Sequence, residues 1–206
     1  MSMQVTSIKP KYRDNYNVGY IGFTFRDKNI ISEGIAYFTR WERMSDIKVS
    51  HALIVTGKNK CIEAIPEGVV ETDLSSYFND PHTQIFFRKP AGYDEVLGKR
   101  IAAAIKNQVG KKYDKWLIAA NMLHGSFLGR WVNTMFQGKP DLYVSKLLND
   151  KDKWICSELA AFAMDSQPEF TDKGILEKPD FTIDPQELFE DQTIFTPWHK
   201  TRPKEV

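Results

Sequence analysis

The order of strand-like and helix-like segments limits the folds that are open to this chain. Alternating or short apolar runs predict strands mainly in the first half, and amphipathic periodicity predicts helices mainly in the second half. The expected strands cover residues 19–25, 47–55, 61–65 and 83–89, with a closing strand at 192–196. The expected helices cover residues 29–41, 72–77, 94–109, 116–136, 140–148 and 155–165, with a last helix that begins at Asp184. Because strands and helices do not alternate regularly, we expect an α+β fold with an antiparallel sheet packed against helices.

The composition excludes several classes of protein. The 206 residues include 28 Lys and Arg against 27 Asp and Glu, and 42% of them are hydrophobic. This chain is too apolar to be disordered, and it has no basic stripe, so we expect no nucleic-acid partner. Two cysteines cannot form a disulfide framework, and neither His82 nor His199 has partners at metal-ligand spacing. We therefore expect a single globular domain over residues 1–206 that holds no metal.

The N-terminal segment lacks the apolar stretch of a secretory signal peptide. No apolar run is long enough to cross a bilayer, since the longest uncharged segment, residues 116–129, is interrupted by Asn121, His124 and two glycines. On this basis we expect a cytoplasmic protein, unless a route without a signal peptide exports it.

A predicted β-hairpin brings a histidine and a glutamate together. The apolar runs at residues 47–55 and 61–65 flank a four-residue turn that contains Gly57. His51 and Glu63 are equally far from Gly57 along the chain, so a loop centred there places them directly opposite each other on one face. A carboxylate beside an imidazole fixes the tautomer of the ring and favours the imidazolium. This prediction depends on the register, because a slip of one residue would put the two side chains on opposite faces.

Cys156 lies in the first turn of the helix expected over residues 155–165. The free backbone N–H groups and the helix dipole favour an anion there, and the thiolate is the nucleophilic form of cysteine. With His51 as a base that Glu63 orients, Cys156 could be the nucleophile of a Cys–His hydrolase. Taken singly, each of the three has an ordinary structural explanation: a small buried cysteine, a structural strand histidine and a solvated glutamate.

Four short motifs resemble those of a known family. They are Ser50-His51-Ala52-Leu53-Ile54-Val55, Ile62-Glu63-Ala64 followed by Gly68-Val69, Gly110-Lys111-Lys112-Tyr113-Asp114, and Cys156-Ser157-Glu158-Leu159. In this order they resemble the YiiX/YebB-like cysteine hydrolases, which belong to the circularly permuted branch of the NlpC/P60 superfamily and have a papain-like fold. The resemblance covers a core of about residues 19–165 and leaves residues 166–206 as a C-terminal extension.

The resemblance implies a role for each residue at a matching position. Cys156 would be the nucleophile, His51 the base, and Glu63 the residue that orients His51. Tyr113 would line the substrate site and could donate a hydrogen bond to the oxyanion. The implied activity is that of a cysteine peptidase or amidase, which needs no metal or organic cofactor. Its substrate would be a small peptide or an amino-acid amide, including peptides of the peptidoglycan type.

Two other functions stay open on the sequence. The apolar segment 116–136 could form a wall for an acyl chain or contact a membrane. That would suit a thiol-dependent acyltransferase or phospholipase, because lecithin:retinol acyltransferase-like enzymes of the same superfamily act on lipids. The other function is a binding module that keeps the fold without hydrolysis, in which Cys156 has an ordinary thiol pKa. Cys61, which has the same strand parity as Glu63, is expected to pack in the core.

Overall fold

The protein combines one antiparallel sheet with helices. The computed structural model describes residues 10–27, 47–113 and 153–197. The strands of the main sheet are β1 (Ile21–Arg26), β2 (His51–Gly57), β3 (Lys60–Ile65), β4 (Gly68–Asp73) and β5 (Thr83–Arg88). They form an open five-stranded sheet in the order β4-β3-β2-β1-β5, and every neighbouring pair is antiparallel. The expected α+β class is therefore confirmed.

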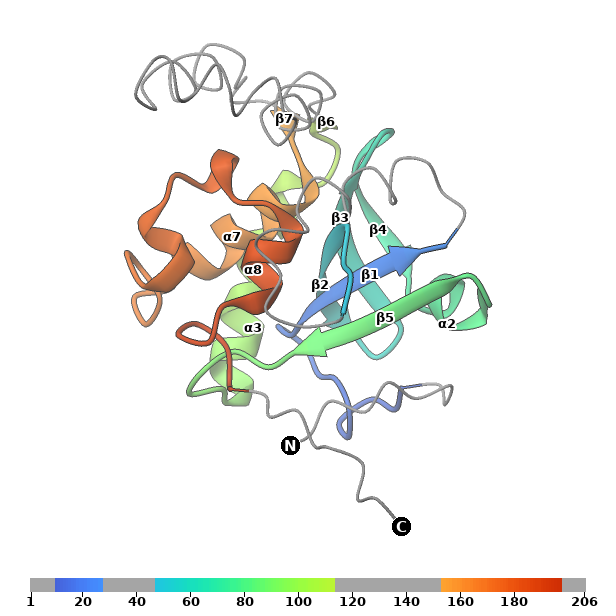
Figure 1. Ribbon diagram of the computed structural model, residues 1–206, viewed down its shortest axis with the longest axis horizontal. Coiled ribbons are helices and arrows are strands. Elements are labelled where there is room, and N and C mark those ends of the chain that lie inside the picture. The colour runs from blue at the N-terminus through green and yellow to red at the C-terminus, as the bar shows by residue number, and fades with distance from the viewer. Residues whose placement is uncertain (1–9, 28–46, 114–152, 198–206) are drawn as a thin grey trace.

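Helices lie on both sides of this sheet. The α-helices of the described residues are α2 (Ser75–Asn79), α3 (Glu95–Ala104), α7 (Cys156–Asp165) and α8 (Pro185–Glu190), and short 3-10 helices cover Lys106–Gln108, Gly174–Glu177 and Asp180–Thr182. In Figure 1, α3, α7 and α8 gather to the left of the sheet, and α2 lies to its right beside β5. Two further strands, β6 (Lys112–Tyr113) and β7 (Lys153–Trp154), form a separate parallel pair.

Strand β2 is buried on both faces. Its even-numbered side chains join the main core with α3, α7 and α8, as shown by Ala52, Ile54, Ile101, Leu159 and Leu188. Its odd-numbered side chains Leu53 and Val55 join a second cluster with Tyr16, Cys61 and Leu74, against which Tyr77 and Phe78 of α2 pack. A strand that is buried on both faces has a continuous apolar sequence instead of an alternating one. This explains why residues 52–55 of β2 are all apolar.

The helix starts follow capping chemistry that the sequence encodes. The Asp94 carboxylate accepts a hydrogen bond from the N–H of Leu97 at 2.7 Å, which fixes the start of α3. The Asp184 carboxylate accepts from the backbone N–H groups of Gln186 and Glu187, and Pro185 occupies the first turn of α8. The predicted start of the last helix at Asp184 is therefore confirmed.

A buried arginine joins the sheet to the C-terminal segment. The guanidinium of Arg88, on β5, donates to the carbonyl oxygens of Phe189 at 2.5 Å, Asp191 at 2.9 Å and Thr196 at 3.3 Å. Its cation also lies over the rings of Phe189 and Phe195. Arg88 is 2% exposed, and burial lowers the pKa of its guanidinium to about 10, so it still carries a charge at neutral pH. The C-terminal residues thus pack into the same core as the sheet.

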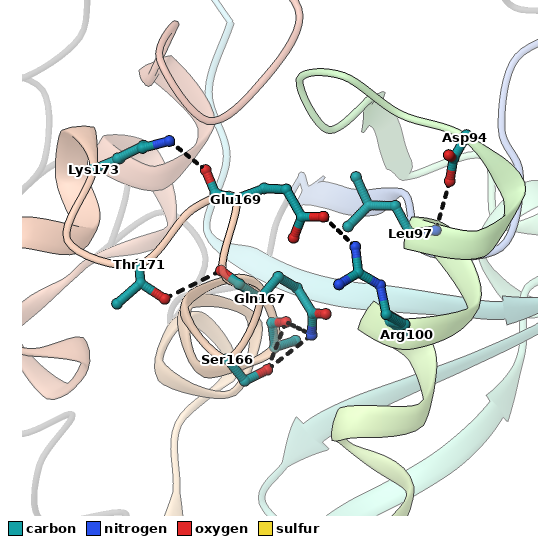
Figure 2. A network of polar contacts seen from close by, with 9 residues as sticks. Asp94, Leu97, Arg100, Ser166, Gln167, Glu169, Thr171 and Lys173 are labelled. Carbon is teal, nitrogen blue, oxygen red and sulfur yellow. Dashed lines mark hydrogen bonds and ion pairs between the residues drawn. The ribbon is translucent and has the colours of Figure 1, made fainter.

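A polar network on the surface ties α3 to the segment that follows α7. Figure 2 shows the guanidinium of Arg100 pointing at the carboxylate of Glu169, with which it forms an ion pair. Lys173 donates to the carbonyl oxygen of Glu169 at 2.8 Å. Because these groups are about half exposed, the ion pair contributes less to stability than the apolar core beneath it.

Several expected elements differ from those in the structure. Gly68, with residues 66 and 67, was expected only to end the second hairpin strand, but the chain turns there and forms β4, which pairs with β3 along its whole length. The segment 72–77 is consequently not one helix, since Asp73 ends β4 and α2 begins at Ser75. The closing strand at 192–196 is wrong as well, because only Phe195 forms an isolated bridge, with Pro90.

The remaining expectations fall into two groups. The helix expected over residues 94–109 is α3, which ends at Ala104 and gives way to the 3-10 helix Lys106–Gln108. The helices expected over residues 29–41, 116–136 and 140–148 lie outside the described residues. Within the described ranges, no helix has both the length and the apolar content that crossing a bilayer requires.

Candidate active site

The three residues singled out from the sequence meet at one place in the fold. His51 is the first residue of β2, Glu63 lies within β3, and Cys156 is the first residue of α7. The Nε2 atom of His51 lies 2.5 Å from Oε2 of Glu63. The side chains of His51 and Cys156 are hydrogen-bonded to each other. Because Nε2 is engaged by the carboxylate, the other ring nitrogen, Nδ1, is left for the sulfur.

The strand register that brings His51 and Glu63 together differs from the expected one. Strands β2 and β3 pair Ile54 with Ile62 and Val55 with Cys61, and the register shifts between Val55 and Gly57. Continued along the strands, this register puts Glu63 opposite the residue two places beyond His51. The prediction of direct opposition is therefore wrong, whereas the predicted shared face is correct. Diagonal neighbours on one face are still close enough for long side chains to meet.

The difference comes from the length of the hairpin loop together with the register shift beside Gly57. Gly57 pairs with Lys60, so only Lys58 and Asn59 form the loop. A two-residue loop shifts the centre of the hairpin away from Gly57 toward the C-terminus. That loop alone would change the register by three residues, but the shift between Val55 and Gly57 takes one residue back. The net change is two residues, which preserves the face of every side chain beyond Gly57.

Glu63 is a buried carboxylate surrounded by hydrogen-bond donors. It is 1% exposed. Besides the imidazole, it accepts hydrogen bonds from the hydroxyl groups of Thr72 and Tyr77. Burial alone would raise the pKa of Glu63, but these donors and the charge of His51 outweigh burial and leave the pKa below its ordinary value. Glu63 is therefore ionised at neutral pH.

His51 is held in its protonated form. Burial lowers the pKa of the imidazole, but the charge and hydrogen bond of Cys156 and those of Glu63 outweigh burial and raise the pKa from 6.5 to about 10. The side chain of His51 keeps 19% of its surface exposed, whereas that of Glu63 keeps 2%. The imidazole is thus the most accessible part of the His51–Glu63 pair.

The surroundings of Cys156 correspondingly favour its thiolate form. Burial raises the pKa of the thiol, but the imidazolium of His51 and the backbone N–H groups of Ala52 and Ser157 outweigh burial and lower the pKa below its ordinary value. The position of Cys156 at the start of α7 acts in the same direction, because the positive end of the helix dipole lies there. These surroundings favour a thiolate–imidazolium pair.

The local backbone explains how α7 reaches β2. The N–H of Ala52 lies beyond the last β2–β3 pair, Ile54 with Ile62, and donates to the sulfur of Cys156. Strand β3 goes on pairing with β4 through Ala64 and Ile65. At the helix, the Glu158 carboxylate accepts from the N–H of Ile155 at 3.3 Å and fixes the first turn of α7.

Tyr113 is placed near this site by its backbone alone. It pairs with Trp154, two residues before Cys156, in the β6–β7 pair. Just before Tyr113, the N–H of Gly110 donates to the carbonyl oxygen of Val69, and the N–H of Val69 donates to the carbonyl oxygen of Lys111. The motif that begins at Gly110 therefore lies beside the Gly68-Val69 motif. The side chain of Tyr113 lies outside the described part of the structure, and its expected role stays a prediction.

Cys61 packs as expected. It is fully buried and free, and its thiol lies 3.6 Å from the carbonyl oxygen of Thr72. Burial raises the pKa of this thiol, so it is protonated at neutral pH. Cys156 is free as well, and no disulfide joins the two cysteines.

Two residues of the site were not found from the sequence. Thr72 and Tyr77 were both assigned to one helix, so neither was expected beside Glu63. With β4 in place, Thr72 pairs with Cys61 and Val70 with Glu63, which puts Thr72 on the same face as the carboxylate. The signal that could have found Thr72 is the alternating segment Gly68–Asp73 after the turn.

Comparisons with known proteins leave the resemblance of the short motifs as it stands. No protein-family model matches the chain, and neither the curated proteins nor the solved structures include a match. Among the residues that the structure describes, no group of three His, Cys, Asp or Glu side chains is arranged to hold a metal ion. The geometry of Cys156, His51 and Glu63 is therefore what carries the functional argument.

Proposed function

We propose that this protein is a cysteine hydrolase that cleaves an amide bond in a small peptide or an amino-acid conjugate. The observation that carries the proposal is the continuous chain from thiolate to imidazolium to carboxylate, with Nε2 of His51 2.5 Å from Glu63. Such a chain provides an activated nucleophile, a proton carrier and a group that orients the carrier. Lowering the pKa of the Cys156 thiol requires only a positive imidazole beside it. A buried carboxylate that contacts the far side of this imidazole is not needed for that purpose.

The chain order supports a circularly permuted papain-like fold of the YiiX/YebB-like type. The histidine and the carboxylate come from β2 and β3, and the nucleophile follows at the start of α7, which packs on the same sheet. A cysteine at a helix N-terminus that faces a histidine on an antiparallel sheet is the arrangement that the four motifs imply. The segment between β6 and β7, residues 114–152, lies outside the described residues, so the support for this fold comes from the sheet and from α7.

The proposed reaction runs in two halves. The Cys156 thiolate attacks the amide carbonyl carbon, and backbone N–H groups of the first turn of α7 stabilise the oxyanion. The His51 imidazolium gives its proton to the leaving nitrogen, the C–N bond breaks, and an acyl-thioester remains on Cys156. Neutral His51 then takes a proton from a water molecule that attacks the thioester. Collapse of the second intermediate releases the acid and restores the thiolate–imidazolium pair.

Mass spectrometry of the acyl-enzyme tests this proposal. We expect the wild-type protein, mixed with a panel of aminoacyl and γ-glutamyl amides, to hydrolyse some of them and to form a covalent adduct on Cys156. Cys156→Ala should abolish both hydrolysis and the adduct, whereas Cys61→Ala should keep both, because Cys61 is buried with a protonated thiol. An adduct that persists in Cys156→Ala would contradict the proposal.

The choice of substrate and the titration of Cys156 separate the two other functions from the proposed one. A lipid-directed acyltransferase or phospholipase rests on residues 116–136, which lie outside the described residues, and it predicts turnover of dispersed phospholipid instead of amides. A binding module predicts that Cys156 titrates like an ordinary thiol. The thiolate–imidazolium pair favours the hydrolase over the binding module.

A further inference from the structure

We propose that Tyr77 is a positioning residue of this site, whose phenol holds the Glu63 carboxylate against His51. The phenolic O–H donates to Oε2 of Glu63, the same oxygen that accepts from Nε2 of His51. Tyr77 contacts neither the sulfur nor the imidazole in these hydrogen bonds, so it would act through Glu63. The inference rests on the proposed function, since it assigns a role within that site.

The helix that carries Tyr77 is fixed firmly to the strands of the site. The N–H of Leu74, just before α2, donates to the carbonyl oxygen of Asn59 at 2.8 Å, and the Leu74 side chain is fully buried. The Asp73 carboxylate accepts from the N–H of Ser75 at 2.8 Å. Phe78 packs with its ring centroid 5.7 Å from that of Tyr16. Because α2 is anchored at its start and along its apolar side, the position of the Tyr77 ring is set by the fold.

The carboxylate needs such a partner because its surroundings offer little other compensation. Within the described ranges, His51 is the residue that forms an ion pair with Glu63. The remaining donors to the carboxylate are neutral hydroxyl groups, those of Tyr77 and Thr72. A buried carboxylate that loses a donor bears the full cost of desolvation for that part of its charge. The phenol therefore helps to keep Glu63 ionised as well as oriented.

Tyr77 remains a donor over the whole working range of pH. Burial raises the pKa of its phenol, and the negative charge of Glu63 raises it further. The proton consequently stays on the phenol oxygen, and the hydrogen bond keeps one direction, from Tyr77 to Glu63. This differs from a relay in which the proton would move to the carboxylate.

The test compares two tyrosines of one aromatic cluster whose hydroxyl groups donate to different partners. Tyr16 belongs to the aromatic cluster that α2 packs against, and its O–H donates to the backbone carbonyl oxygen of Lys58 at 2.6 Å, away from the site. Tyr16→Phe removes a partly buried hydrogen bond without touching Glu63. Tyr77→Phe removes a hydrogen bond of the same kind that ends on the carboxylate.

The measurement is the rate of alkylation of Cys156 by iodoacetamide as a function of pH, followed by mass spectrometry of the peptide that contains Cys156. In Tyr77→Phe, Glu63 should become protonated at a higher pH, so the acidic limb of the profile should move up by about one pH unit. Tyr16→Phe should leave the limb in place. If Tyr77→Phe fails to fold, Tyr77→3-fluorotyrosine keeps the ring and strengthens the donor, and the limb should then move down.

The outcomes distinguish this inference from the proposed function. If Cys156 of the wild-type protein titrates as an ordinary thiol, the proposed function fails, and the role of Tyr77 fails with it. If the wild-type thiolate is stabilised but Tyr77→Phe and Tyr16→Phe have the same profile, the proposed function stands and the role of Tyr77 is overturned. An unmoved limb in the fluorotyrosine variant would overturn it as well.

Discussion

The sulfur of Cys156 accepts a hydrogen bond from the backbone N–H of Ala52, the residue that follows His51 in β2. The first two residues of one strand therefore supply both the imidazole and a backbone donor to the thiolate. Strand β2 is free to do so because its pairing with β3 runs only through Ile54 and Ile62 in this direction. The start of β2 thus pairs with β1 on one side and contacts the start of α7, instead of β3, on the other.

Replacement of His51 by alanine should return Cys156 to a weakly reactive thiol. Without the imidazolium, burial dominates and the pKa of Cys156 rises, so the thiolate fraction near pH 6.5 falls. We expect the rate of alkylation of Cys156 at this pH to fall by about tenfold or more. Stopped-flow alkylation with mass-spectrometric site assignment measures it.

His82→Ala is the matched control for this prediction. His82 lies in the loop before β5, where its backbone N–H donates a hydrogen bond to the Asp80 carboxylate at 3.0 Å. This variant removes an imidazole elsewhere in the fold and should leave the reactivity of Cys156 unchanged. Equal rates for wild-type protein and His51→Ala would contradict the assignment of His51 as the partner of the thiolate.

Glu63→Gln should change how stability depends on pH. The pKa of Glu63 is lowered in the folded protein, so its charge stabilises the fold fully above the ordinary value of 4.5. This contribution is lost as the pH falls through the lowered pKa. At neutral pH, the variant loses charge-assisted hydrogen bonds and should be less stable by about 1–3 kcal/mol.

The test is urea unfolding of wild-type protein and Glu63→Gln at a series of pH values. The difference between their free energies of unfolding should be largest near neutrality and should shrink below pH 4.5. Glu71→Gln serves as a control, because Glu71 is an exposed carboxylate on the neighbouring strand β4 that pairs with Lys60. A constant difference across the whole pH series would show that the Glu63 charge does not act as inferred.

Much of the site could be predicted from the sequence because the net error in register is even, and an even error keeps each side chain on its face. The turn around Gly57 located the hairpin, and alternation then placed His51 and Glu63 on one face. The shorter loop and the shift between Val55 and Gly57 together change the register by two residues, an even number. The position of Cys156 at a helix start was equally local information, and α7 does begin at Cys156.

The rest of the site depends on which segments pair with each other, and the periodicity within one segment does not fix its partner. Thr72 and Tyr77 reach Glu63 only because β4 pairs with β3. The turn before Gly68, which on the sequence alone indicates the end of a strand, reverses the chain into β4. Strand β2 begins at His51 and not at residue 47, because the side chain of Gln186 binds the backbone of that segment. A side chain 137 residues away leaves no mark on the local periodicity.

Arg88→Lys should destabilise the fold although the charge is kept. The planar guanidinium donates to three carbonyl oxygens of the C-terminal segment and stacks on two phenylalanine rings. A lysine ammonium is a compact charge that cannot reproduce this fork. We expect the free energy of unfolding, measured by chemical denaturation, to fall by about 2–4 kcal/mol.

Arg26→Lys is the control, because Arg26 forms an exposed ion pair with Asp80, and its loss of stability should be less than about 1 kcal/mol. Similar losses in the two variants would contradict the role given to Arg88.

Gln186→Ala should weaken both the fold and the reactivity of Cys156. The Gln186 amide accepts from the N–H of Val49 at 3.0 Å and donates to the carbonyl oxygen of Ile47 at 3.1 Å, as a neighbouring strand would. This double contact fixes the segment that leads directly into His51. Its loss should cost about 1–3 kcal/mol of stability, because two backbone groups lose their partner. It should also slow alkylation of Cys156 at neutral pH several-fold.

Gln167→Ala separates the two effects of the Gln186 variant. Gln167 is 4% exposed, and its amide donates to the carbonyl oxygen of Ala163 at 3.1 Å and to the hydroxyl of Ser166 at 3.0 Å, at the far end of α7 from Cys156. This variant should lose stability by a similar amount but keep the alkylation rate of the wild-type protein. If both variants slow alkylation equally, the effect belongs to general loss of stability, and Gln186 has no specific part in placing His51.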